Sequence, residues 1–253
     1  MKPLTRHPVR VTLRLFWLIA EFALGALNYA RQCGFAKNCT ANQRAVWLQH
    51  FCRRLLRIFK TRIKTSGSIP KSGLLVSNHV SYVDILVIAS ITPAIFVAKH
   101  EVKSWPVFGF FAKLAGTVFV DRERRTRVGE TTSEIETALN EGALVVLFPE
   151  GTSSNGETVL PFKSSLLEPA ARQTHALFAS HIHYEIDDGD VREEVCYWSD
   201  AHTLLPHLIN LLSKRTINAE VRFTQLREAS TDRKELAKQL HSEILRLKES
   251  SAF

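Results

Sequence analysis

From residue 65 onward, short apolar runs alternate with longer stretches of helical periodicity. Four of these runs, at 73–77, 94–98, 143–148 and 176–186, have the length and apolar character of buried strands. Strands that alternate with helices are typical of α/β domains, in which helices cover a largely parallel sheet. We therefore expect an α/β fold with a mixed central sheet flanked by helices.

Weaker signals complete this expected body, residues 65–253. We expect another strand at 116–120, and residues 196–199 and 219–224 show weaker strand patterns. We expect helices at 85–90, at 126–141 with Gly142 as the C-terminal cap, from Pro206 onward, and at 232–249. An apolar content of 45% excludes wholesale disorder.

Positive charge is concentrated at the start of the chain. Residues 1–64 carry 13 of the 33 lysines and arginines and one acidic residue, which gives them a net charge of +12. The remaining residues carry 20 basic against 24 acidic side chains, a net charge of −4. Such asymmetry indicates that the first quarter binds something anionic, either nucleic acid or a phospholipid surface.

Residues 11–30 form a long apolar stretch that is interrupted every seven residues, by Arg14, Glu21 and Asn28. On a helix these three side chains share one narrow polar stripe. The length suffices to cross a bilayer, but a glutamate in mid-span is costly there. The pattern favours a helix that lies in the membrane interface, or is embedded at a slant, over a clean span or a signal peptide.

Residues 44–64 predict a second, basic amphipathic helix. Its apolar half is formed by Trp47, Phe51, Leu55, Ile58, Phe59 and Ile63, and its cationic half by Arg53, Arg54, Arg57, Lys60 and Lys64. The pattern is typical of membrane-surface binding, and the alternative is a helix packed on its own domain. No zinc-finger, basic-zipper or RNA-recognition signature is found, so we expect lipid and not nucleic acid as the partner. Residues 1–64 are thus expected to form a membrane-associating helical hairpin.

The four cysteines show no C-x-x-C pattern. Cys33, Cys39, Cys52 and Cys196 are therefore expected to be reduced thiols in a cytosol-like compartment, with disulfides as the less favoured alternative.

The first polar cluster, NHVSYVD at 78–84, lies between an expected strand and an expected helix. A histidine is the side chain best suited to accept a proton near neutral pH, and a carboxylate can fix its tautomer. His79 and Asp84 are therefore candidates for a catalytic pair. The spacing of Ser81 and Asp84 equally suits a helix cap, so these residues alone leave both roles open.

Two further clusters follow strands. FPEGTSS at 148–154 contains Gly151, which lets the backbone approach a ligand, and Thr152, which can hold anionic oxygens; a plain turn is the alternative. In DRERR at 121–125, Arg122 can bind a phosphate, although a solvated charge run is the default for such a stretch.

Other chemistries are disfavoured. His181 and His183 share one face of a strand, but a third metal ligand is not evident, so no metal site is expected. The sequence contains neither a G-x-S-x-G elbow nor a G-x-x-x-x-G-K-[ST] loop, which argues against a serine nucleophile and against ATP-driven chemistry.

Taken in order, NHVSYVD, GTVFVDR at 116–122 and FPEGTSS resemble the signature blocks of the 1-acyl-sn-glycerol-3-phosphate acyltransferase family. FVAKHEVKSWPVFG at 96–109 and LPFKSSLLEPA at 160–170 are also similar, so the resemblance covers about residues 70–185. One departure is Ala179, at a position where the family usually has a proline, and it leaves acyl-chain fit and acceptor identity in doubt.

The resemblance implies that His79 deprotonates the acceptor hydroxyl, that Asp84 orients His79, and that the hydroxyl attacks an acyl thioester directly. It also implies a set of substrate-binding residues: Asn78, which would also help to order the turn, Lys99, Arg122, Glu150, Gly151 and Thr152.

The expected function is therefore acyl transfer from acyl-CoA or acyl carrier protein to 1-acyl-sn-glycerol-3-phosphate, without a further cofactor, at the cytoplasmic face of the cell membrane. Another lysolipid, such as lyso-ornithine lipid, is the alternative acceptor. A non-catalytic basic protein that binds membranes or nucleic acid is the alternative from another class.

Overall fold

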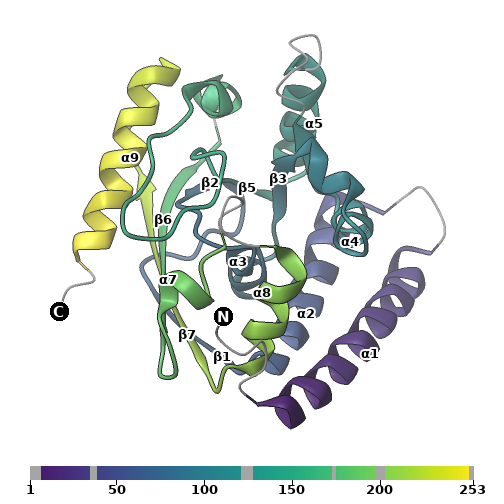
Figure 1. Ribbon diagram of the computed structural model, residues 1–253. Helices are drawn as coiled ribbons and strands as arrows, with labels where there is room; N and C mark the ends of the chain where they lie inside the picture. Colours follow the sequence, from purple (N-terminus) through teal and green to yellow (C-terminus); the bar gives the residue numbers. More distant parts are fainter. Residues whose placement is uncertain (1–6, 35–38, 121–127, 173–174, 198–202, 251–253) are drawn as a thin grey trace.

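The computed structural model describes residues 7–34, 39–120, 128–172, 175–197 and 203–250 (Figure 1). Its strands are β1 (Thr61–Ser66), β2 (Gly73–Ser77), β3 (Ile95–Lys99), β4 (Val118–Val120), β5 (Leu144–Leu147), β6 (Leu177–Ile186) and β7 (Ile217–Leu226). These strands form a seven-stranded sheet in the order β1-β7-β6-β2-β5-β3-β4. Only the β6–β7 pair of this sheet is antiparallel. The expected mixed sheet is confirmed.

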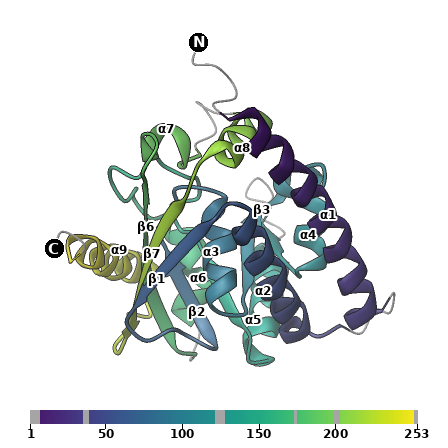
Figure 2. The same cartoon turned by 90° about the horizontal axis from the view of Figure 1, so that it is seen from below.

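Helices cover both faces of the sheet. On one face lie α1 (Pro8–Cys33), α2 (Ala41–Ile58), α3 (Val83–Ile91) and α8 (Leu204–Ser213). The other face is covered by α5 (Val128–Asn140), η3 (Ser164–Leu167), α6 (Glu168–Arg172) and α9 (Arg233–Glu249). Shorter elements are η1 (His100–Ser104), α4 (Phe108–Leu114) and α7 (Val191–Glu194). In both views α9 and α1 lie on opposite sides of the molecule (Figures 1 and 2).

Most of the expected elements are present. The weak strand signal at 219–224 is the centre of β7, and Gly142 follows α5 with a φ of 79°, in the left-handed region that glycine tolerates. The strand prediction for 196–199 is wrong at Cys196 and Tyr197, which lie in a loop. Residues 198–199 lie outside the described residues.

The helix expected at 44–64 ends earlier, at Ile58. Lys60 has a φ of 50°, which breaks the helical path, and Thr61–Ser66 then pairs in parallel with β7. A short run in which charged and apolar residues alternate suits an edge strand as well as a helix end, and pairing with a distant strand decides between them. The helix prediction is therefore wrong for residues 59–64, which form a turn and the start of β1.

The apolar half of α2 is buried in its own domain. Trp47 is only 1% exposed, and its Nε1 donates a 3.1 Å hydrogen bond to the carbonyl oxygen of Gly25 in α1. Phe51 stacks on Trp47 with ring centroids 5.5 Å apart. The alternative interpretation, a helix packed on its own domain, is thus the correct one for α2, and membrane anchoring by residues 1–64 stays a proposal that rests on α1.

The polar stripe of α1 points inward. Arg14 donates hydrogen bonds of 2.9 and 2.5 Å to the carbonyl oxygens of Leu212 and Lys214 at the end of α8, and Glu21 pairs with Arg54 of α2 at 2.7 Å. The apolar side chains of α1 that are exposed are Val9, Leu13, Leu15, Phe16, Trp17, Ile19, Leu24 and Leu27. By length and composition α1 is a candidate membrane span. It presents an apolar surface outward and holds the charges of Arg14 and Glu21 against the protein.

The expectation of four reduced thiols is wrong for two of them. Cys33 and Cys39 form a disulfide across the connection between α1 and α2, with Cα atoms 5.1 Å apart. Sequence spacing cannot reveal this pairing, because it depends on the two helices packing side by side. Cys52 and Cys196 are free and buried.

Candidate active site

The candidate catalytic pair occupies the turn between β2 and α3. Asp84, in the first turn of α3, accepts three hydrogen bonds on Oδ2: 2.8 Å from Nδ1 of His79, 2.7 Å from the N–H of Val80 and 3.0 Å from the N–H of Ser81. The sequence left open whether Asp84 caps the helix or supports His79. One carboxylate oxygen bonds His79 and also the backbone N–H groups of Val80 and Ser81, just before α3, whereas the N-cap residue Tyr82 makes no side-chain cap bond.

This geometry selects the tautomer of His79. A carboxylate in this arrangement accepts from every partner, so the proton of the neutral imidazole lies on Nδ1 and the lone pair lies on Nε2. The ring stacks on Phe148 with centroids 4.2 Å apart and lies in the wall of a cavity. A basic nitrogen beside a cavity, with a buried carboxylate behind it, is the arrangement of a general base.

Glu150 holds the backbone on which His79 sits. Its Oε1 accepts a 2.8 Å hydrogen bond from the N–H of His79, and its Oε2 accepts a 3.2 Å bond from the N–H of Leu160. The N–H of Ser154 donates a 2.9 Å bond to the carbonyl oxygen of His79. Burial raises the pKa of Glu150 to about 8, although both backbone donors lower it.

Asn78 plays a similar part on the other side of the turn. Its Nδ2 donates a 3.1 Å hydrogen bond to the carbonyl oxygen of Ile182 on β6, and its Oδ1 accepts a 2.8 Å bond from the N–H of the same residue. The side chains of Asn78 and Glu150 are thus engaged by backbone groups. Their direct contact with substrate, implied by the resemblance, stays a prediction that these contacts do not support.

The other expected substrate-binding residues are placed as follows. Gly151, Thr152 and Lys99 line the same cavity as His79. Gly151 has a φ of 71°, a conformation that favours glycine, so the FPEG turn needs this residue. Lys99 is exposed at the end of β3. Arg122 lies outside the described residues.

The cavity itself is apolar and has a volume of about 320 Å³. Its walls come from helices on the α1 side of the sheet, chiefly Leu18 and Phe22 of α1, Phe51 and Leu55 of α2, and Phe108 and Phe111 of α4. An apolar cavity with a few polar groups at one end is typical of a site for a hydrocarbon ligand. His79 lines this cavity, as do the polar residues Tyr82, Lys99 and Thr152.

Sequence reasoning did not single out Tyr82 and His207. The Tyr82 hydroxyl lies 3.1 Å from Nδ1 of His207, whose Nε2 lies 3.1 Å from the carbonyl oxygen of Cys196. Because a carbonyl can only accept, Nε2 carries the proton and Nδ1 accepts from Tyr82. Burial raises the pKa of Tyr82, so it stays a donor. Tyr82 lies inside the NHVSYVD block, but its partner is 125 residues away in sequence, and no local signal identifies it.

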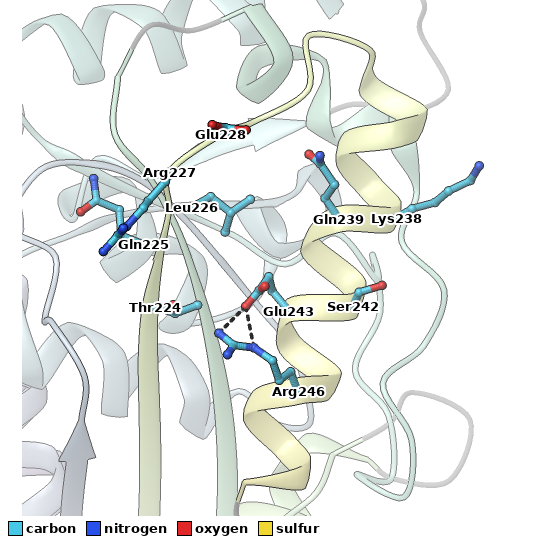
Figure 3. Close-up of a pocket in the computed structure, with 10 residues that line it drawn as sticks. All are labelled: Thr224, Gln225, Leu226, Arg227, Glu228, Lys238, Gln239, Ser242, Glu243 and Arg246. Atoms are coloured by element: carbon cyan, nitrogen blue, oxygen red, sulfur yellow. Dashed lines mark hydrogen bonds and ion pairs between the residues drawn. The ribbon is translucent and has the colours of Figure 1, made fainter.

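A second, polar cavity of about 660 Å³ lies between β7 and α9, where Arg246 pairs with Glu243 (Figure 3). Leu226, in its wall, pairs with Leu177 at the start of β6, and Leu177 is also the partner of Leu74 near the start of β2. This cavity therefore lies at the end of the sheet opposite to the dyad, and we assign it no part in the chemistry.

Comparison with known proteins defines the class. A family model described as Acyltransferase matches residues 43–182, more than half of the chain. A lyso-ornithine lipid O-acyltransferase of Brucella abortus is 36% identical over 95% of this chain and 96% of its own length. The chain belongs to the acyltransferase family, within which its relatives are lysolipid acyltransferases. The expected family and the expectation of an acyltransferase enzyme are confirmed.

Two further similarities bear on substrate and fold. A 1-acyl-sn-glycerol-3-phosphate acyltransferase of Neisseria gonorrhoeae is 34% identical over 51% of this chain and 54% of its own length. The crystal structure of the 1-acyl-sn-glycerophosphate acyltransferase of Thermotoga maritima superposes with a TM-score of 0.65, covers 96% of both chains, and shares 19% sequence identity. The second similarity establishes the fold.

Proposed function

We propose that this enzyme transfers a fatty acyl group from an acyl thioester to the hydroxyl of lyso-ornithine lipid at a membrane surface. The observation that carries the reaction type is the hydrogen bond between Asp84 and His79, whose ring lines an apolar cavity. The acceptor is supported by the Brucella abortus relative, whose similarity extends along nearly the whole chain.

The proposed reaction uses His79 as the base. Its Nε2 takes the proton of the acceptor hydroxyl while the hydroxyl oxygen attacks the thioester carbon. The resulting tetrahedral oxyanion collapses, the carbon–sulfur bond breaks, and the imidazolium returns the proton to the departing thiolate. Asp84 stabilises the imidazolium between these steps, and a positioned base of this kind contributes about 10²–10⁴-fold in rate.

Phosphatidic acid synthesis is the second candidate. It is favoured by the Neisseria gonorrhoeae relative and by the arginine block GTVFVDR, in which Arg122 would bind the acceptor phosphate. The sequence-based expectation gave this acceptor precedence. We reverse that order in the proposal, because three relatives that match over more than three quarters of the chain carry the lyso-ornithine lipid name.

We further propose that α1 binds the membrane at the cytoplasmic face, where acyl-CoA and acyl carrier protein occur. Its outward side chains are apolar, whereas Arg14 and Glu21 are fastened to α8 and α2. A full span would have to pull both charges off the protein and into lipid, which is costly. The geometry thus supports a helix lying along the interface.

An acceptor panel tests the proposal. Purified full-length protein is incubated with labelled acyl-CoA or acyl carrier protein and with lyso-ornithine lipid, 1-acyl-glycerol-3-phosphate or other lysophospholipids at equal mole fractions in vesicles. We expect the highest kcat/KM with lyso-ornithine lipid and none with His79→Ala. A preference for 1-acyl-glycerol-3-phosphate would establish the second candidate, and transfer to no acceptor would refute both.

A further inference from the structure

Both oxygens of the Asp84 carboxylate are engaged, and they are engaged by different parts of the chain. Oδ2 accepts from His79 and from the two backbone groups of the same turn. Oδ1 accepts a 2.7 Å hydrogen bond from the hydroxyl of Tyr184 on β6, 100 residues away in sequence. Tyr184 lies outside the three motif blocks, and the reaction described above does not use it.

The contact is fully shielded from solvent. Asp84 is 0% exposed and Tyr184 is 2% exposed. Burial, and then the nearby negative charge of Asp84, raises the pKa of Tyr184 well above its ordinary value. The hydroxyl therefore stays protonated and donates a hydrogen bond to the carboxylate. A hydrogen bond to a charged group in such surroundings is strong.

The same strand is tied to the catalytic turn a second time. Asn78 exchanges two hydrogen bonds with the backbone of Ile182, two residues before Tyr184. Residues two apart on a strand point to the same face, and Ile182 and Tyr184 both pack in the core on the α3 side. The strand β6 thus holds the turn by its backbone and the carboxylate by a side chain.

We propose that Tyr184 is a positioning residue of the acyl-transfer reaction. Its hydroxyl keeps the Asp84 carboxylate aligned with His79 and withdraws negative charge from it, which limits how strongly the carboxylate attracts the imidazole proton. The inference rests on the proposed function, because it assigns Tyr184 a part in the step that His79 performs.

Loss of the Tyr184 hydroxyl should shift the pH dependence of activity in a defined direction. Without Tyr184 as a donor, more negative charge stays on Oδ2, and the imidazolium form of His79 is stabilised. The base is then lost to protonation at a higher pH, so the acid limb of the kcat/KM profile moves upward. The charge of Asp84 also raises the pKa values of Glu150 and Cys196, and both residues are retained in Tyr184→Phe.

The test is Tyr184→Phe, which keeps the ring and removes the hydroxyl, beside Tyr29→Phe as a matched control in α1. We expect kcat to fall about 10- to 100-fold, as for loss of a charged hydrogen bond, with KM nearly unchanged. The acid limb should move to higher pH. In an Asp84→Asn background the same substitution should cost little more, because Tyr184 acts through Asp84.

Several outcomes would overturn the inference. The first is a wild-type kcat in Tyr184→Phe, and the second is an acid limb of the kcat/KM profile that stays where it is in the wild type. The third is a double variant in which the kcat losses of Tyr184→Phe and Asp84→Asn multiply in full. Transfer to no acceptor by the wild type would refute the proposed function instead. A second measurement does not need turnover: the downfield Nδ1–H resonance of His79 should shift in Tyr184→Phe, stay unchanged in Tyr29→Phe and disappear in Asp84→Asn. An unshifted resonance in Tyr184→Phe contradicts the inference.

Discussion

Oε1 of Glu150 lies 2.8 Å from the backbone nitrogen of His79, so the FPEG turn and the NHVSYVD turn share a buried hydrogen bond. The resemblance assigned Glu150 to substrate binding, where a carboxylate near a lipid phosphate is awkward. Its position removes that difficulty, because the carboxylate faces backbone donors and fixes the backbone of His79, the proposed base.

We therefore expect Glu150→Gln to lower kcat about tenfold, since one glutamine oxygen cannot replace two carboxylate acceptors for two buried N–H groups. The pH dependence of stability has a definite sign. The pKa of Glu150 is raised from 4.5 to about 8, so the folded state binds more protons than the unfolded state between these values. The contribution of Glu150 to the free energy of unfolding of the wild type falls as the pH rises through that window and is constant above it.

Glu150→Gln lacks that dependence. Thermal melts from pH 5 to 9 should show a shallower loss of Tm for the variant than for the wild type. Parallel curves would show that Glu150 does not titrate in this range, whatever the activity of the variant.

Asp84→Asn is expected to lower kcat about 100-fold or more while the protein stays folded. Oδ2 alone accepts from His79, Val80 and Ser81, and an asparagine oxygen in its place carries no full negative charge. The variant therefore holds the Nδ1–H tautomer of His79 less firmly and cannot stabilise its charged form. Labelled acyl transfer measures kcat, and Asp187→Asn, an exposed change of the same kind, is the control. Equal activity of the two variants would remove Asp84 from the mechanism.

Phe16→Asp and Trp17→Asp should each weaken binding to vesicles that contain anionic phospholipid. Phe16 is 70% exposed on α1, and an aspartate there opposes burial in lipid by about 2.5–3.5 kcal/mol at full depth. Vesicle flotation measures the bound fraction. Ile69→Asp places the same charge on an exposed apolar residue outside α1 and should bind as the wild type does. Equal losses in all three would disprove a specific role for α1.

Gly25→Ala is expected to shift the preference toward shorter acyl chains. A Cβ atom at Gly25 would lie 2.6 Å from Cε2 of Phe51, whose ring stacks on Phe111 in the cavity wall. Phe51 must then move toward the cavity, and overpacking of this kind costs about 1–3 kcal/mol. Competition between acyl-CoA chain lengths measures the shift. Leu24→Ala, on the exposed face of the same helix, should leave the profile unchanged.

Local sequence predicts what is decided locally. The buried strands and the pair of His79 and Asp84 are readable because apolar runs and a five-residue spacing fix them within a few residues. The amphipathic pattern around Trp47 is different, since an apolar helix face fits lipid and protein core equally well. Only the packing of α1 and α3 on α2 shows that the apolar face of α2 meets protein core and not lipid.

Contacts between distant segments are the second limit. Nothing near Tyr184 distinguishes it from an ordinary core tyrosine, because its partner Asp84 is 100 residues away. The edge strand Thr61–Ser66 was assigned in part to a helix for the same reason: β7, which it joins, lies at the far end of the sequence. The roles of Asn78 and Glu150 likewise appear only when the strands are assembled.

The hydrogen bond between Asn78 and Ile182 joins positions 104 residues apart, so it can form only after the ribosome has synthesised β6. The catalytic turn leaves the ribosome long before β6, the strand that pins it, so a nascent chain carries His79 and Asp84 without the framework that aligns them. The proposed membrane helix α1 emerges earlier still. If α1 binds lipid as proposed, a growing chain can therefore settle on a bilayer before it is able to transfer acyl groups.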